Sequence, residues 1–133
     1  MDAALIAAGS LGLAGAAIHG VAGELLVVRR LSADRLPATR FGGPRATMTM
    51  IHVTWHTTTA AFVTVACALL LAGTVLDGDA ARGVALVAAA AASSFAAIAL
   101  VLGGAALSPR GLLRHPGPLM LTSVAVLAWV GAL

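Results

Sequence analysis

Residues 3–30 read AALIAAGSLGLAGAAIHGVAGELLVVRR, an apolar run that ends at two adjacent arginines. An α-helix rises 1.5 Å per residue, so about 20 apolar residues cross a hydrocarbon core of about 30 Å. The run is longer than that, and it predicts a membrane-spanning helix from Ala3 to Val28. We expect a mature helix here rather than a secretory signal, because Met1 and Asp2 supply no basic segment in front of it.

Three further apolar stretches also predict membrane-spanning helices, at about residues 46–76, 80–107 and 116–133. Of the 133 residues, 60% are hydrophobic and only 10% are charged, whereas about a quarter of the residues in a soluble domain are charged. So few charges cannot cover a surface that faces water, and a chain this apolar is not disordered. We therefore predict an all-α fold, in which residues 1–133 form a single integral membrane domain. Its architecture is an up-down antiparallel four-helix transmembrane bundle.

The eight Lys and Arg residues are all arginines, and seven of them lie in two connectors. Five lie within residues 29–45 and two within residues 108–115, whereas the connector at Asp77 and Asp79 is acidic apart from Arg82. The positive-inside rule places the connectors 29–45 and 108–115 in the cytoplasm and both termini outside. This grouping is unlike the basic stripe of a nucleic-acid interface, so we expect the lipid bilayer and no nucleic acid as partner. A chain rich in alanine and glycine, with arginine but no lysine, favours a bacterial inner membrane.

Four ionisable side chains fall within the first two spans, where such groups are costly and commonly functional. Counted from the bordering arginines, His19 and His56 lie about 15 and 16 Å deep, while His52 and Glu24 lie about 10 and 7 Å deep. His52 and His56 are four residues apart and project from one helix face. His19 lies on a glycine-rich face, and Glu24, about 140° further round an α-helix, reaches the same place only from its edge. We expect the imidazoles to converge in the cytoplasmic half of the bundle.

Three imidazoles and one carboxylate form a sensible ligand set for a transition metal, namely copper, zinc or iron. Alternatively, His19 and His56 are the axial ligands of a haem b whose propionates reach the basic connector. The histidines can also simply hydrogen-bond between helices and hold the bundle together. Glu24 can pair with a connector arginine instead of binding a metal. The leading hypothesis is a redox-type membrane protein that binds a metal or haem at His19, His52, His56 and Glu24, and it assigns no reaction.

Three short motifs are spread along the chain. They are His19-x-x-x-Gly23-Glu24, Trp55-His56 and His115-Pro116. Together they resemble small four-span proteins of the bacterial inner membrane that have no assigned reaction. The resemblance implies a four-helix architecture and a functional set of His19, Glu24 and His56.

Two other functions remain open. A small proton-coupled transporter would line its path with Glu24, His52 and His56. Because four helices enclose only a narrow lumen, such a transporter would need to be a homo-oligomer. A non-enzymatic accessory subunit would bury helix 80–107 against a larger membrane complex, because alanine-rich faces suit close helix approach. At the start of the last span, His115 is expected to act as a helix cap.

Overall fold

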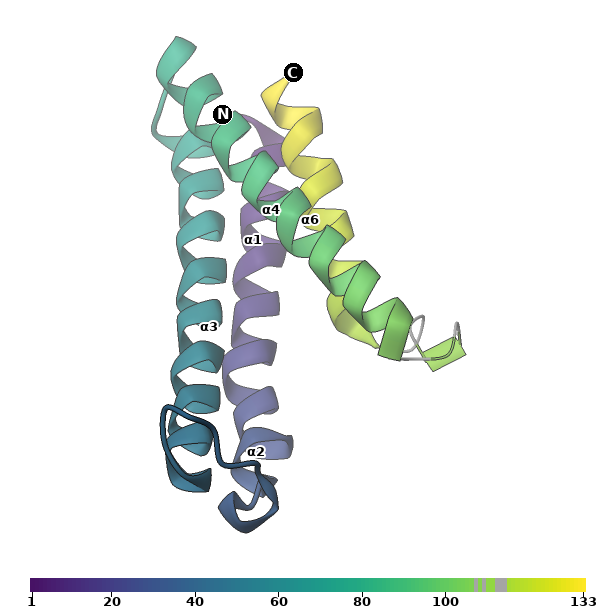
Figure 1. Cartoon of the computed structure of the whole chain (residues 1–133). Helices are drawn as coiled ribbons and strands as arrows, with labels where there is room; N and C mark the ends of the chain where they lie inside the picture. Colours follow the sequence, from purple (N-terminus) through teal and green to yellow (C-terminus); the bar gives the residue numbers. More distant parts are fainter. Residues whose placement is uncertain (107, 109, 112–114) are drawn as a thin grey trace. The chain divides into compact units, whose positions relative to one another are not determined.

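The computed structural model describes residues 1–106, 108, 110, 111 and 115–133. In this part of the chain there is no strand, only an isolated bridge between Thr39 and Gly42. The four main helices of the described residues are α1 (Ala3–Ala17), α3 (Pro44–Thr74), α4 (Gly78–Ala106) and α6 (Pro116–Ala132) (Figure 1). The prediction of an all-α fold with four helices is confirmed. Two features of the sequence prediction, Leu107 as the end of the third span and Arg114 in its connector, lie outside the described residues.

The first helix changes its geometry after α1. It continues through η1, a π turn (Ile18–Gly23), α2 (Glu24–Leu26) and a 3-10 turn, η2 (Val28–Arg30), and the connector holds a second 3-10 turn, η3 (Ala33–Arg35). A π turn hydrogen-bonds residues five apart instead of four, so it rotates everything that follows it relative to an ideal α-helix. The sequence pattern predicts a regular α-helix over this segment, and the π turn departs from it.

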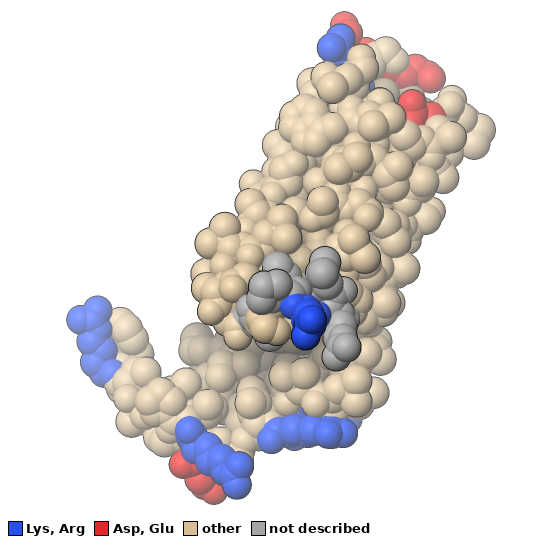
Figure 2. Space-filling view, turned by 90° about the vertical axis from the view of Figure 1, so that its right-hand side faces the viewer, with Lys and Arg blue, Asp and Glu red and all other residues tan. Residues whose placement is uncertain are grey.

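Three helical segments of the described chain are long and apolar enough to cross a membrane: Ala3–Arg30, Pro44–Thr74 and Gly78–Ala106. The helix α6 is also apolar but has only 17 residues, a length of about 25 Å. On the face shown in Figure 2, the charged side chains gather at helix ends and connectors, and the helix surfaces between them are uncharged. Long apolar helices with charges only at their ends are typical of a membrane protein.

The chain forms two compact units. The first consists of Met1–Gly15 and Phe62–Leu133, and the second of Ala16–Ala61. The core of the first unit is mostly alanine, including Ala85, Ala89 and Ala128, and α4 packs against α6 there. Small side chains let helix backbones come close, which is how helices associate where lipid removes the hydrophobic driving force between them.

Side chains cap the first and last helices. The carboxylate of Asp2 accepts a hydrogen bond from the backbone N–H of Leu5 at 2.9 Å. At the start of α6, the Nδ1 atom of His115 accepts from the N–H of Gly117 at 3.2 Å, and Pro116 occupies the first helical position. Both arrangements satisfy amide groups that have no partner inside the helix. The expectation that His115 acts as a cap is confirmed.

Glycine permits the closest approach between α1 and α3 in the first unit. A Cβ atom added to Gly9 would lie 2.6 Å from Cγ of Leu70 and 2.8 Å from the carbonyl oxygen of Ala66. One added to Gly12 would lie 2.9 Å from Cβ of Ala66. Because a backbone oxygen is among these neighbours, the side chains alone cannot make room.

We therefore expect Gly9→Ala to lower the free energy of unfolding by about 1–3 kcal/mol, through overpacking. The measurement is equilibrium unfolding of the purified protein in mixed micelles with increasing sodium dodecyl sulfate. Gly83→Ala on α4 is the matched control, since an added Cβ meets nothing within 4 Å there, and it should be neutral or stabilise by up to about 1 kcal/mol. Equal losses in both variants would contradict a close contact at Gly9.

Candidate metal centre

In the second unit, the π turn lies with its backbone directly on the side chains of α3. A Cβ atom added to Gly20 would come within 2.7 Å of Cγ2 of Thr59, and one added to Gly23 would overlap the indole ring of Trp55. Two glycines one turn apart thus form a flat surface on which α3 rests. The residues next to these glycines are thereby brought against α3.

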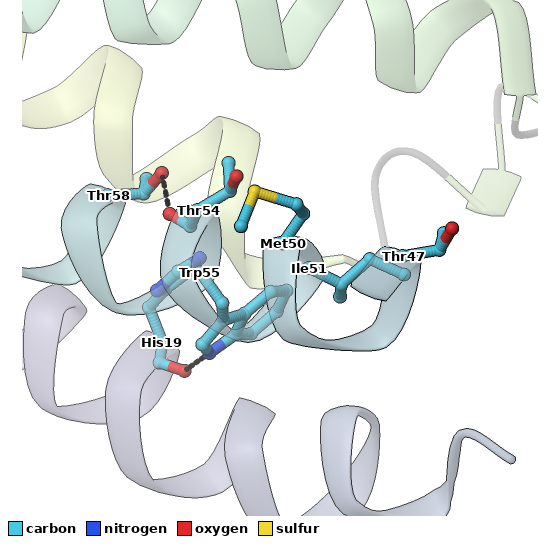
Figure 3. A pocket seen from close by; sticks show the side chains of 7 residues that line it. All are labelled: His19, Thr47, Met50, Ile51, Thr54, Trp55 and Thr58. Atoms are coloured by element: carbon cyan, nitrogen blue, oxygen red, sulfur yellow. Dashed lines mark hydrogen bonds between the residues drawn. The ribbon is translucent and has the colours of Figure 1, made fainter. Parts of the chain in front are cut away.

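His19 is fixed by its neighbours on α3. Its ring stacks on Trp55, with 4.2 Å between ring centroids and 12° between planes. Its carbonyl accepts a hydrogen bond from Nε1 of Trp55 at 3.2 Å (Figure 3). Its Nδ1 atom lies 2.9 Å from the hydroxyl of Thr59, which itself donates to the carbonyl of Trp55 at 3.1 Å. A hydroxyl has one proton to give, so Thr59 accepts from Nδ1–H of His19, which assigns the tautomer.

A shallow groove of about 500 Å³ runs along one face of α3. It is lined by His19, Thr47, Met50, Ile51, Thr54, Trp55 and Thr58 (Figure 3). At helical spacing, His52 and His56 project from a different face of α3. The groove and the pair of histidines are therefore separate features of the second unit.

On that other face, three potential ligands converge: Glu24, His52 and His56. One donor atom from each lies within 4.8 Å of the other two. Nε2 of His56 and Oε2 of Glu24 are 3.6 Å apart. In a tetrahedral zinc site with bonds of about 2.0–2.1 Å, donor atoms are about 3.3 Å apart. Binding one ion would therefore draw the three donors closer together, by up to about 1.5 Å for the most distant pair.

The two carboxylate oxygens of Glu24 lie in different surroundings. Oε1 lies 3.3 Å from Nε of Arg29, so the predicted pairing with a connector arginine is present. Oε2 is buried and has no hydrogen-bond partner in the described part of the chain, and the side chain is only 14% exposed. A buried, unpartnered carboxylate oxygen is costly. A cation held between Glu24 and the two imidazoles would remove that cost.

The structure rearranges the predicted set. It brings Glu24, His52 and His56 together, and the described residues that converge there do not include His19, which contacts Thr59 and Trp55. The π turn accounts for the place of Glu24. In a π turn residues five apart lie on the same side, whereas the same separation is about 140° in an α-helix. Glu24 consequently faces α3 and stands within the group rather than at its edge.

Comparisons with protein-family models, curated proteins and solved structures give no match. The function is therefore inferred from the ligands themselves. Two imidazoles and one carboxylate are a ligand set of zinc enzymes, which keep a fourth position open. The same set with open positions occurs in non-haem iron(II) proteins. Chemically, this centre can hold a divalent metal and present it to a further ligand.

We expect Gly23→Ala to push Trp55 away from the π turn and to break its hydrogen bond to the His19 carbonyl. The indole N–H resonance of Trp55 in a ¹H–¹⁵N NMR spectrum should then move to the position of a weaker hydrogen bond. The resonance of Trp129, identified with Trp129→Phe, reports on the first unit and should stay in place. Gly83→Ala is the control and should move neither. An unchanged Trp55 resonance would contradict the glycine contact.

Proposed function

We propose that this chain is a metal-binding membrane protein in which Glu24, His52 and His56 hold one divalent first-row transition ion. The observation that carries the proposal is the buried Oε2 oxygen of Glu24, which lacks a hydrogen-bond partner and lies beside two convergent imidazoles. Zinc and iron(II) suit this nitrogen and oxygen donor set better than copper(I), which prefers sulfur ligands.

The surroundings of the three ligands support the same proposal. His52 and His56 share the i, i+4 spacing by which one helix gives two imidazoles to a single ion. Arg29 engages one oxygen of Glu24 and leaves the other directed at His56. Partners of this kind orient a metal ligand and tune its basicity.

Binding of haem by His19 and His56 is less well supported. It would take His56 out of the group with Glu24 and leave Oε2 of Glu24 buried without a partner. It would also give His52 no role. A metal ion uses all three side chains that the fold brings together.

For the setting of this centre, we propose a multi-pass inner-membrane protein of bacterial origin with both termini outside. The connectors 29–45 and 108–115 lie in the cytoplasm in this arrangement. The proposal is supported by the grouping of the arginines and by three helices long enough to cross a membrane. The metal centre then lies in the cytoplasmic half of the hydrocarbon layer.

The purified protein should bind one Zn²⁺ or Co²⁺ per chain, measured by calorimetry and by the visible absorption of bound Co²⁺. Changes to groups around a ligand already cost 10–100-fold in affinity, so Glu24→Gln, His52→Ala and His56→Ala should each weaken binding by more than about 100-fold. His19→Ala and His115→Ala are the controls and should leave the affinity nearly unchanged. Absence of binding, or an equal loss in the controls, would overturn the proposed centre.

Single cysteines test the orientation in the membrane. In a Cys67→Ala background, Ser32→Cys should react with an impermeant maleimide in inverted membrane vesicles but not in intact spheroplasts. Ala80→Cys should show the opposite pattern, because it follows the acidic connector. Labelling of both positions from the same side would refute the antiparallel arrangement of the spans.

A further inference from the structure

The proposed metal centre lies at the surface of its unit. The side chain of His56 is 56% exposed, whereas that of Glu24 is only 14% exposed. Glu24 and His52 therefore close the inner side of the centre, and the coordination positions they leave open lie on the outward side, next to His56. Whatever completes the coordination of the metal has to come from outside the unit.

The outward side is mostly apolar. Val53 and Ala60, one turn before and after His56 on α3, are both exposed, and Val21 and Leu25 on either side of Glu24 are 63% and 49% exposed. No charged residue occurs among these neighbours. An exposed apolar surface on a membrane-spanning helix faces acyl chains.

Two threonines lie on this face of α3: Thr57, which is exposed between Val53 and Ala60, and Thr49, whose hydroxyl is already bonded. Thr49, one turn before His52, donates its hydroxyl proton to the carbonyl of Arg45 at 3.1 Å. A threonine bonded to its own helix in this way satisfies its polar group locally. Apart from Thr57, the side chains at the approach to the open positions are aliphatic, which suits a molecule dissolved in the membrane better than one dissolved in water.

We propose that the open positions of this metal take a lipid-soluble ligand with an oxygen-donor head group, such as a quinol, a phenol or an alkyl hydroxamate. The inference rests on the proposed function, since it concerns the same ion. Oxygen donors match zinc and iron(II) bound by imidazole and carboxylate. An apolar tail matches the rim of exposed aliphatic side chains around the centre.

The test uses the full chain in lipid nanodiscs, loaded with Co²⁺, and two probes that share one head group. Decyl hydroxamate should change the visible spectrum of the bound Co²⁺, whereas acetohydroxamate at the same concentration in the sample should not. A response to acetohydroxamate that matches the decyl probe, after correction for partitioning into the membrane, would overturn the inference and show a centre open to water. A Co²⁺ spectrum that neither probe alters would overturn it by showing a closed centre. A chain that gives no Co²⁺ spectrum at all refutes the proposed function itself.

A bulky side chain at the rim gives a second, independent measurement. Val53→Trp should weaken decyl hydroxamate binding at least about tenfold, or 1.4 kcal/mol, while leaving the affinity for Co²⁺ unchanged. The control is Val126→Trp on α6, which is similarly exposed, at 55%, and belongs to the other unit. Equal binding of the probe by both variants would place the entrance elsewhere and contradict the inference.

Discussion

The backbone of the π turn touches the side chains of α3 because Gly20 and Gly23 have no Cβ atom, and the rest of the second unit depends on this contact. It lets the ring of Trp55 reach His19 for stacking and reach its carbonyl for a hydrogen bond. It also carries Glu24, the next residue in the chain, to within 3.6 Å of His56. The candidate centre is therefore a consequence of helix packing, and its ligands need no loop to position them.

Small residues also allow close helix packing in the first unit. Gly9 and Gly12 rest on Leu70 and Ala66, and the core between α4 and α6 is mostly alanine. In lipid, helices gain nothing by hiding apolar surface from water, so association depends on dispersion contacts and hydrogen bonds between close backbones. Small residues allow that closeness over the whole length of a helix. The composition of this chain, with 15 glycines and abundant alanine, follows from this requirement.

The sequence was sufficient to predict the all-α class, because long apolar runs bordered by arginines admit few alternatives. It also predicted that His52 and His56 share a face, since α3 is regular. It placed Glu24 only at the edge of the set, and it did not predict that His19 instead contacts Thr59 and stacks on Trp55. The place of Glu24 depends on the π turn, whose hydrogen bonds shift the register by one residue. The nearby glycines do not predict such a turn, because glycine is also common in regular membrane helices.

The charges of the site favour the proposed metal ion over a simple ion pair. Arg29 is 66% exposed and already engages Oε1 of Glu24, so Oε2 is the carboxylate oxygen that has no hydrogen-bond partner among the described residues. One protonated imidazole, that of His56, would be enough to compensate this oxygen. His52 adds nothing to such a pair, and a second proton so close would only repel the first. Two imidazoles beside a carboxylate instead offer three donor atoms within 4.8 Å of one another, a set that suits a cation. The proposed metal ion thus gives His52 a role that charge pairing alone does not.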